Sequence, residues 1–155
     1  METKKQPIKR HQALQPFSRQ HHFGLLFSWK LRKGLSKNIE MERLMAFSKW
    51  FFENEIQPHF EDEEKFLFPL FPEGNELVDR ALREHRRIRR LFTDESDLER
   101  SLHRLEEELD AHIRFEERVL FNEIQKVATP EQLDKIDEIH QEVKYMEYED
   151  PFWED

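Results

Sequence analysis

A ten-residue pattern that occurs twice constrains this chain more than any other feature. Residues 59–68 and 112–121 share the frame His-x-x-x-Glu-Glu-basic-x-Leu-Phe, and the two copies lie 53 residues apart (112 − 59). On a helix, residues i and i+4 lie on the same face, so His59 is predicted to lie beside Glu63 and His112 beside Glu116. A carboxylate next to an apolar Leu-Phe stripe costs free energy unless it is protonated, paired or bound to a cation. Two such pairs therefore indicate a cation between them.

The composition indicates a single all-α domain over residues 1–155. The chain has 155 residues, enough for a hydrophobic core, and is 37% hydrophobic and 38% charged. It contains only 3 glycines and 7 prolines, and it is rich in leucine, glutamate, lysine and arginine. This balance favours helices over a sheet.

The composition also excludes several classes of chemistry. The chain has no cysteine, which excludes disulfides, thiolate metal sites and cysteine catalysis and leaves histidine and carboxylate as metal ligands. The first residues are not followed by an apolar run, and no uninterrupted apolar stretch approaches the length of a membrane span, so we expect a cytoplasmic protein without a membrane partner. The formal charge of −9 argues against a nucleic-acid partner.

The spacing of apolar residues predicts four long helices, at about 18–36, 38–68, 76–92 and 97–128. Ser18 is the predicted N-cap of the first helix, and the residues up to Pro16 are predicted to be an irregular lead-in. Pro58 predicts a kink immediately before His59. The predicted apolar face of the first helix consists of Leu25, Trp29, Leu31 and Leu35.

A short fifth helix is predicted at the C-terminal side of the fourth. Thr129, Pro130 and Glu131 have the pattern of an N-cap, a first-position proline and an acidic first turn. The acidic and aromatic tail at 148–155 is expected to be either loose or packed on the outside. Because the connections are short, the expected architecture is an up-down-up-down four-helix bundle with a core at about 17–128, followed by the short fifth helix.

Two further histidines complete a candidate ligand set. The third helix contains Arg83-Glu84-His85, and the first contains Arg19-Gln20-His21-His22. The shared Arg-x-His pattern favours His21. His22 remains an alternative, because Leu25 and Trp29 follow it by three and seven residues, as Ile88 and Phe92 follow His85. Glu117 is likewise an alternative to Glu116 if the fourth helix is rotated. His11, His103 and His140 have no matched partner in the sequence and are interpreted as surface or structural residues.

The resulting inventory is four imidazoles and two carboxylates. Nitrogen and oxygen ligands without sulfur suit iron, manganese or zinc. Two carboxylates that bridge two metals, with two imidazoles for each metal, leave room for a solvent-derived bridge and an open position. An open position is typical of a redox or oxygen-binding centre and absent from a purely structural site.

Residues 57–64 (Gln-Pro-His-Phe-Glu-Asp-Glu-Glu) and 83–88 (Arg-Glu-His-Arg-Arg-Ile), together with the second His-x-x-x-Glu pair, resemble the hemerythrin-like (HHE cation-binding) family. The resemblance covers about residues 17–128. It implies a four-helix bundle around two non-haem iron ions joined by an oxo or hydroxo bridge. Glu63 and Glu116 would be the bridging carboxylates, and the terminal ligands would be His21, His59, His85 and His112.

Two positions depart from the oxygen-carrying members of that family. Those proteins have an additional histidine on the third helix where this chain has Arg89, and their last carboxylate is an aspartate at the position of Glu117. These departures argue against simple reversible oxygen carriage. The ligand set is more similar to that of the sensing, redox or iron-handling members.

Three functional hypotheses follow from the sequence. The leading one is a di-iron protein that binds or senses oxygen, peroxide or nitric oxide, or handles iron, with a protein partner if it is a sensor. The second is a di-iron redox enzyme, either a peroxidase or oxidase or an iron donor for cluster repair. The third is a metal-free helical interaction module in which the histidines are structural. Metal content separates the third hypothesis from the other two.

Overall fold

The computed structural model describes residues 9–140 and 145–154, and within these ranges all regular secondary structure is helical. Helices account for 80% of these described residues, which form no strand. The predicted all-α class is confirmed. Of the predicted lead-in, residues 1–8 lie outside the described ranges. None of the described helices is long and apolar enough to cross a membrane.

Seven α-helices are present in the described residues: α1 (Gln15–Ser36), α2 (Met41–Phe51), α3 (Gln57–Asp62), α4 (Glu76–Thr93), α5 (Leu98–Phe115), α6 (Phe121–Val127) and α7 (Pro130–Ile139). Shorter turns link several of them. The 3-10 turns span Gln12–Leu14 and Phe68–Leu70. The wider π turns span Phe52–Ile56, Glu63–Leu67 and Glu116–Leu120.

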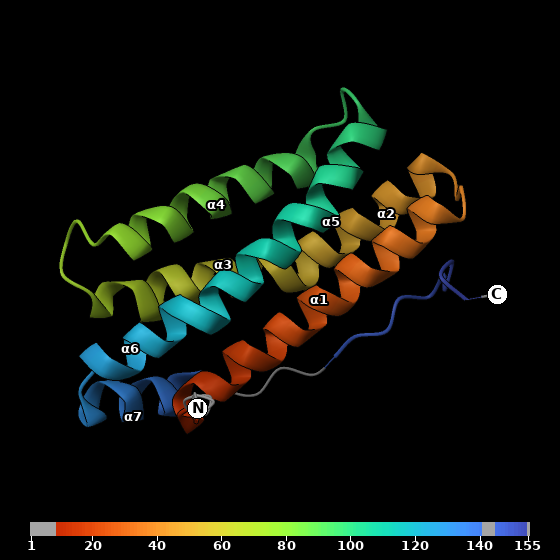
Figure 1. The fold of residues 1–155 in the computed structure, drawn as a ribbon. Helices are drawn as coiled ribbons and strands as arrows, with labels where there is room; N and C mark the ends of the chain where they lie inside the picture. Colours follow the sequence, from red (N-terminus) through yellow and green to blue (C-terminus); the bar gives the residue numbers. More distant parts are fainter. Residues whose placement is uncertain (1–8, 141–144, 155) are drawn as a thin grey trace, which may run out of the picture.

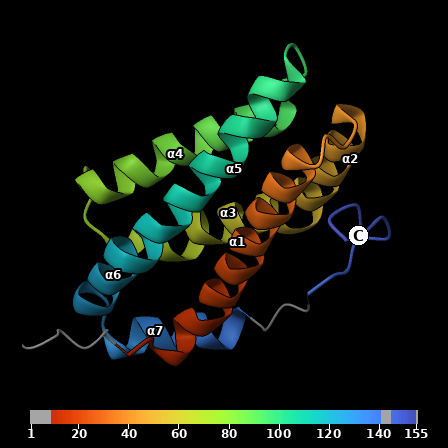
Figure 2. The same ribbon diagram turned by 45° about the vertical axis from the view of Figure 1, so that its right-hand side comes forward.

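These elements form four long helical segments that lie side by side in both views (Figure 1, Figure 2). The segments are α1, α2 with α3, α4, and α5 with α6. Helix α5 packs along both α1 and α4, and α2 contacts α1, α4 and α5. Helix α7 lies at the end where α1 begins and α6 ends. Side chains from all four segments therefore meet in one interior.

The N-terminal start of α1 differs from the prediction. The helix begins at Gln15, directly after the turn at Gln12–Leu14, so Ser18 lies inside it and does not cap it. Pro16 occupies the first turn, where the missing N–H is tolerated. His11 caps the preceding turn by accepting from the backbone N–H of Ala13 at 3.0 Å. The apolar residues of this segment are buried, which explains why it is ordered rather than irregular.

The second and fourth predicted helices are not continuous α-helices. The second begins at Met41, since Asn38 has a left-handed backbone (φ 57°) that ends the preceding turn. A π turn at Phe52–Ile56 precedes Pro58, so the irregularity that proline predicts is present as a wider turn. The fourth helix is interrupted by the π turn at Glu116–Leu120, which apolar periodicity alone does not reveal.

The predicted apolar face of α1 is partly wrong. Leu31 and Leu35 are buried, but Trp29 is 46% exposed and Leu25 is only half-buried. The face that packs inward also contains small and polar residues, including Gly24, where an added Cβ would lie 2.5 Å from Cδ1 of Ile113. This close approach of α1 to α5 explains why a count of large apolar residues misjudges the face.

The C-terminal elements agree with the prediction where they are described. Thr129 caps α7 and forms a reciprocal capping box with Gln132. The tail packs on the outside: Phe152 is buried against Phe47 at a ring-centroid distance of 5.0 Å. Arg43 donates to Asp150 at 2.6 Å and holds the tail over α2.

Candidate metal centre

Six buried side chains, all predicted from the sequence, converge in the interior. They form two groups of four that share Glu63 and Glu116, and in each group the candidate ligand atoms lie within 4.8 Å of one another. One group, called the α1 group here, adds His21 and His59. The other, called the α4 group, adds His85 and His112. None of the six residues is more than 4% exposed.

Glu63 lies between histidines from three segments. Its Oε2 is 3.2 Å from Nε2 of His59 and 3.3 Å from Nε2 of His21. Its Oε1 is 3.2 Å from Nε2 of His85. One carboxylate thus faces imidazoles of both groups, as a bridging ligand must.

Glu116 has the corresponding position on the opposite segment. Its Oε1 is 2.9 Å from Nε2 of His21 and 3.1 Å from Nε2 of His112. Its Oε2 is 3.7 Å from Nε2 of His85. Each copy of the repeated frame therefore supplies one terminal imidazole and one shared carboxylate.

Matching π turns begin at these two glutamates. The N–H of Phe68 donates to the carbonyl of Glu63, and the N–H of Phe121 donates to the carbonyl of Glu116, five residues back in each case. Wider turns of this kind occur frequently at functional sites. The repeat in sequence is thus also a repeat in backbone conformation, and the sequence pattern did not predict it.

The other ring nitrogen of each histidine faces an outer acceptor. The Nδ1 atoms of His59, His85 and His112 lie 2.6, 2.7 and 2.8 Å from carbonyl or carboxylate oxygens. The acceptors are Gln20 Oε1, Glu64 Oε2 and Glu84 Oε1 respectively. Nδ1 of His21 lies 3.6 Å from Oε2 of Glu117. A proton held on Nδ1 leaves the Nε2 lone pair directed inward, which is the arrangement of a metal-bound histidine.

Several inward atoms have no hydrogen-bond partner. They are Nε2 of His59, His85 and His112, both carboxylate oxygens of Glu63, and Oε2 of Glu116. Buried polar atoms are normally paired, so a group of unpaired ones directed at one point is typical of a ligand site. The donors are nitrogen and oxygen, which suit a first-row metal ion. The residues therefore fit a bound cation.

The charges of the cluster also fit a bound cation. Burial lowers the pKa of His85, but the carboxylates of Glu116, Glu63 and Glu64 outweigh burial and raise it to about 10. Burial and Glu116 raise the pKa of Glu63, but His59 and His21 lower it to about 2. In the absence of a cation, protons on the imidazoles supply the positive charge that the two carboxylates require, and a metal ion can replace those protons.

Phenylalanine rings cover the imidazoles. Phe60 stacks on His85 at 3.8 Å between ring centroids, and Phe121 stacks on His21 at 4.9 Å. Phe68 contacts His85 at 5.4 Å. The last residue of each frame thus packs on the lone histidine of a neighbouring segment and keeps water away from its ring.

The alternatives left open by the sequence have distinct positions. His22 is exposed on α1, whereas His21 is buried in the cluster. Glu117 is 28% exposed, lies outside the two groups and accepts from the hydroxyl of Ser18 at 3.0 Å. Arg89, where oxygen carriers have a histidine, donates to Glu64 at 2.9 Å.

The residues that sequence reasoning missed are the outer acceptors. Gln20 and Glu84 directly precede His21 and His85, so they are the middle residue of the Arg-x-His pattern. Glu64 and Glu117 are the second glutamate of each frame; no role was predicted for Glu64 from the sequence, and Glu117 was considered only as an alternative ligand to Glu116. Their recurrence at equivalent positions was the signal that could have identified them.

The three unmatched histidines lie outside the two groups. His11 caps a turn and His103 is exposed. His140 is buried at the end of α7, where it stacks on Phe17 at 4.0 Å and lies 3.2 Å from Asp62. Sequence reasoning gave no indication of this burial, because the contact joins residues far apart in the chain.

Comparisons with known proteins identify the domain. The family model of the hemerythrin HHE cation-binding domain matches residues 19–95, which include His21, His59, Glu63 and His85. The match ends before His112 and Glu116, which the fold brings to the same cluster. No curated protein and no solved structure matches the chain. Residues 19–95, which carry four of the six clustered side chains, are therefore similar to the hemerythrin HHE cation-binding domain.

Proposed function

We propose that this protein binds two iron ions, one in the α1 group and one in the α4 group, with Glu63 and Glu116 shared between them. The observation that carries this proposal is the pair of overlapping four-residue groups, whose ligand atoms are buried and converge within 4.8 Å. Two carboxylates common to both groups are what a two-metal site needs. Manganese or zinc would fit the same donors.

The scaffold that we propose for this site is the up-down-up-down four-helix bundle expected from the sequence. In support, every long segment contributes to the cluster: α1 through His21, α3 and its π turn through His59 and Glu63, α4 through His85, and α5 and its π turn through His112 and Glu116. Inward ligands from four packed segments are typical of bundle metal sites.

A bound iron pair would supply redox capacity and an open position for oxygen, peroxide or nitric oxide. The chain's own side chains would hold the ions, orient the imidazoles through their Nδ1 acceptors and exclude water with phenylalanine rings. We therefore propose a protein that binds or senses such a molecule, or handles iron.

Binding or sensing is favoured over turnover by the surroundings of the cluster. Both tyrosines lie in the tail, where Tyr148 packs on Phe47 and Trp50 and Tyr145 packs on Phe23, so neither is placed beside the ligands. A sensor would need a protein partner to transmit its state. The net charge of −9 disfavours nucleic acid as that partner.

The test is metal content together with an optical spectrum. Purified protein is loaded with ferrous iron under argon, freed of excess metal and assayed for iron per chain before and after addition of oxygen, peroxide or nitric oxide. We expect two iron ions per chain and a spectrum that changes with one of the three molecules. The matched control is His103→Ala, which removes an exposed imidazole outside both groups.

Each outcome has a defined meaning. Well under two metal ions per chain, with every metal offered, would overturn the two-iron proposal, and no bound metal at all would leave the metal-free interaction module. A spectral change that reverses when the small molecule is removed supports binding or sensing. Continuous consumption of peroxide or oxygen would replace that role with the redox enzyme.

A further inference from the structure

The two groups have equal numbers of ligands but unequal outer acceptors. In the α4 group, both imidazoles donate from Nδ1 to carboxylates, His85 to Glu64 at 2.7 Å and His112 to Glu84 at 2.8 Å. In the α1 group, His59 donates to the neutral amide of Gln20 at 2.6 Å. The remaining imidazole, His21, has its carboxylate at the longer distance of 3.6 Å.

A carboxylate acceptor and an amide acceptor have different effects on a metal-bound imidazole. Both orient the ring, but only the carboxylate adds negative charge and makes Nε2 a stronger donor to the metal. The α4 group has two such partners at hydrogen-bonding distance. The α1 group has none.

Nearby arginines offset part of the charge of every outer glutamate, in both groups alike, so the difference that remains is the pair of carboxylates hydrogen-bonded to imidazoles in the α4 group. Arg89 lies 2.9 Å from Glu64, Arg80 lies 2.9 Å from Glu84, and Arg10 lies 3.4 Å from Glu117. Each outer glutamate therefore has one arginine, whichever group it serves. The unequal positions are Gln20 and its counterpart Glu84.

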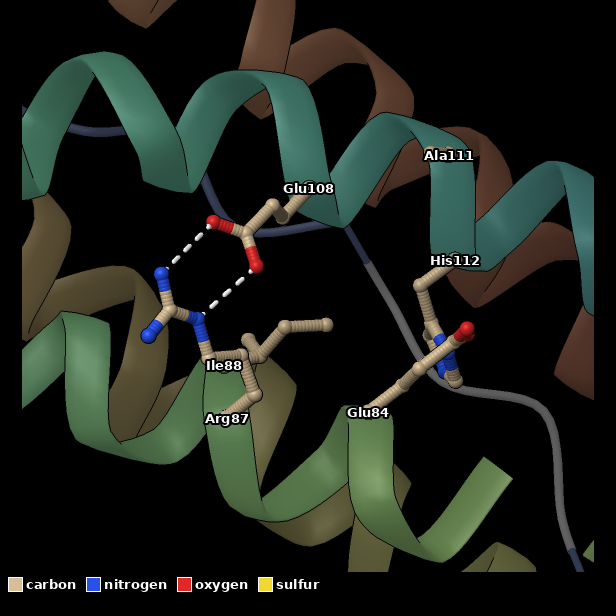
Figure 3. A pocket seen from close by; sticks show the side chains of 6 residues that line it. All are labelled: Glu84, Arg87, Ile88, Glu108, Ala111 and His112. Carbon is tan, nitrogen blue, oxygen red and sulfur yellow. Dashed lines mark hydrogen bonds and ion pairs between the residues drawn. The ribbon is translucent and has the colours of Figure 1, made fainter. Parts of the chain in front are cut away.

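The two acceptors also differ in their exposure to solvent. Glu84 and His112 line a cavity of about 120 Å³ between α4 and α5, whose rim carries the Arg87–Glu108 ion pair (Figure 3). The side chain of Glu84 is 30% exposed, whereas Gln20 is 9% exposed. The α4 group thus has a solvent-linked carboxylate, and the corresponding part of the α1 group is dry and neutral.

We infer that the position held by His85 and His112 binds its metal ion first and more tightly than the position held by His21 and His59. Gln20 and Glu84 are the positioning residues that set this order. The inference rests on the two-metal site proposed above. It adds that the site loads in two steps, so that a one-metal form exists between the empty and full forms.

The experiment is a titration of metal-free protein with Co²⁺, followed by visible absorption and calorimetry. Outer carboxylates typically change metal affinity by about 10- to 100-fold, so we expect two steps separated by a factor of that order. Crystals grown with one equivalent of Co²⁺ should show its anomalous signal beside His85 and His112. Equal occupancy of both positions, or a first ion beside His21 and His59, would overturn the inference.

Two isosteric variants test the cause of the order. Glu84→Gln keeps an oxygen for the Nδ1 hydrogen bond but removes its charge, so the first step should weaken by about 10-fold or more and approach the second. Gln20→Glu should strengthen the second step toward the first. The matched control is Glu108→Gln, which removes one charge from the same cavity without touching an imidazole and should leave both steps unchanged.

The readouts separate this inference from the proposed function. If the wild-type protein takes up two Co²⁺ ions in a single step, the two-metal site stands and the loading order is wrong. If it takes up no Co²⁺ and no iron, the proposed function fails and the inference fails with it. If Glu108→Gln weakens the first step as much as Glu84→Gln, general charge is responsible and the role of Glu84 is overturned.

Discussion

The histidine and carboxylate cluster and the aromatic end of the interior are built by neighbouring parts of the same helical segments from opposite kinds of side chain. At the aromatic end, Phe27 stacks on Phe51 at 4.5 Å and on Phe47 at 5.1 Å between ring centroids. In the cluster, two carboxylates and four imidazoles are buried to a similar extent. Apolar burial stabilises the first region without any ligand. The second holds buried charge that needs protons or metal ions.

The two regions therefore contribute differently to the stability of the fold. Apolar packing holds the segments together, and the cluster that they enclose is stabilised only when its charge is balanced. Gly24 shows how closely they are joined, since it lets α1 approach Ile113 on α5, next to the candidate ligand His112. Variants in the two regions should consequently affect stability and metal content in different ways.

The largest effect on the cluster is expected from Glu63→Ala. Glu63 belongs to both groups, so its loss should remove both metal ions, whereas His59→Ala or His112→Ala removes a ligand from one group only. The thermal stability added by metal should disappear, about 4 kcal/mol for an ion present at a thousand times its Kd. Metal analysis and thermal melts with and without chelator check this. If all three variants kept two metal ions, the ligand assignment would be wrong.

The largest effect on the aromatic end is expected from Phe27→Ala. Phe27 is fully buried and stacks on neighbouring rings, so the free energy of unfolding should fall by about 3–5 kcal/mol. The folded fraction should still bind two metal ions, because no cluster atom changes. Denaturant unfolding with metal analysis of the folded protein tests this separation. A loss of metal as complete as in Glu63→Ala would show that the two regions are not independent.

A change of pH should alter the stability that the cluster contributes and leave the contribution of the aromatic end unchanged. The pKa of His85 is raised from 6.5 to about 10, so its contribution to the stability of the metal-free protein is complete below pH 6.5 and is lost as the pH rises toward 10. The pKa of Glu63 is lowered to about 2, so its contribution is present above pH 4.5 and is lost as the pH falls through 2.

The metal-free protein should therefore be most stable between about pH 4.5 and 6.5, with a change of up to about 1.4 kcal/mol per pH unit for each group outside that window. Metal binding displaces the protons, so the metal-loaded protein should not lose this stability between pH 6.5 and 10. Parallel denaturant curves of both forms measure the difference. Identical pH profiles for the two forms would contradict the replacement of protons by metal.

The smallest effects are expected from the exposed histidines. His22→Ala and His103→Ala should leave the metal content unchanged and alter stability by about 0.5 kcal/mol or less. His21→Ala, one residue from His22 but buried in the cluster, should lose metal. The paired comparison of His21→Ala with His22→Ala decides the ligand on α1. Loss of metal in His22→Ala would reverse the assignment.

Much of the fold and the whole inner set of six residues could be predicted from the sequence. The i,i+4 spacing of His59 with Glu63 and of His112 with Glu116 is a local property of a helix, so it can be seen without tertiary information. The all-α class, the capped start of α7 and the buried Leu31 and Leu35 are local in the same sense. The exposed Trp29 was mispredicted, because the face of α1 depends on the close contact at Gly24.

The sequence by itself determined that two histidine and carboxylate pairs recur on helices, with two further histidines on the helices between them. Only the tertiary structure decided which side chains complete the cluster from outside, because Gln20, Glu64 and Glu84 reach imidazoles 39, 21 and 28 residues away. Such contacts depend on how helices pack rather than on local periodicity. The π turns at Glu63 and Glu116 were likewise not apparent from the sequence, because apolar spacing does not reveal a change in turn width.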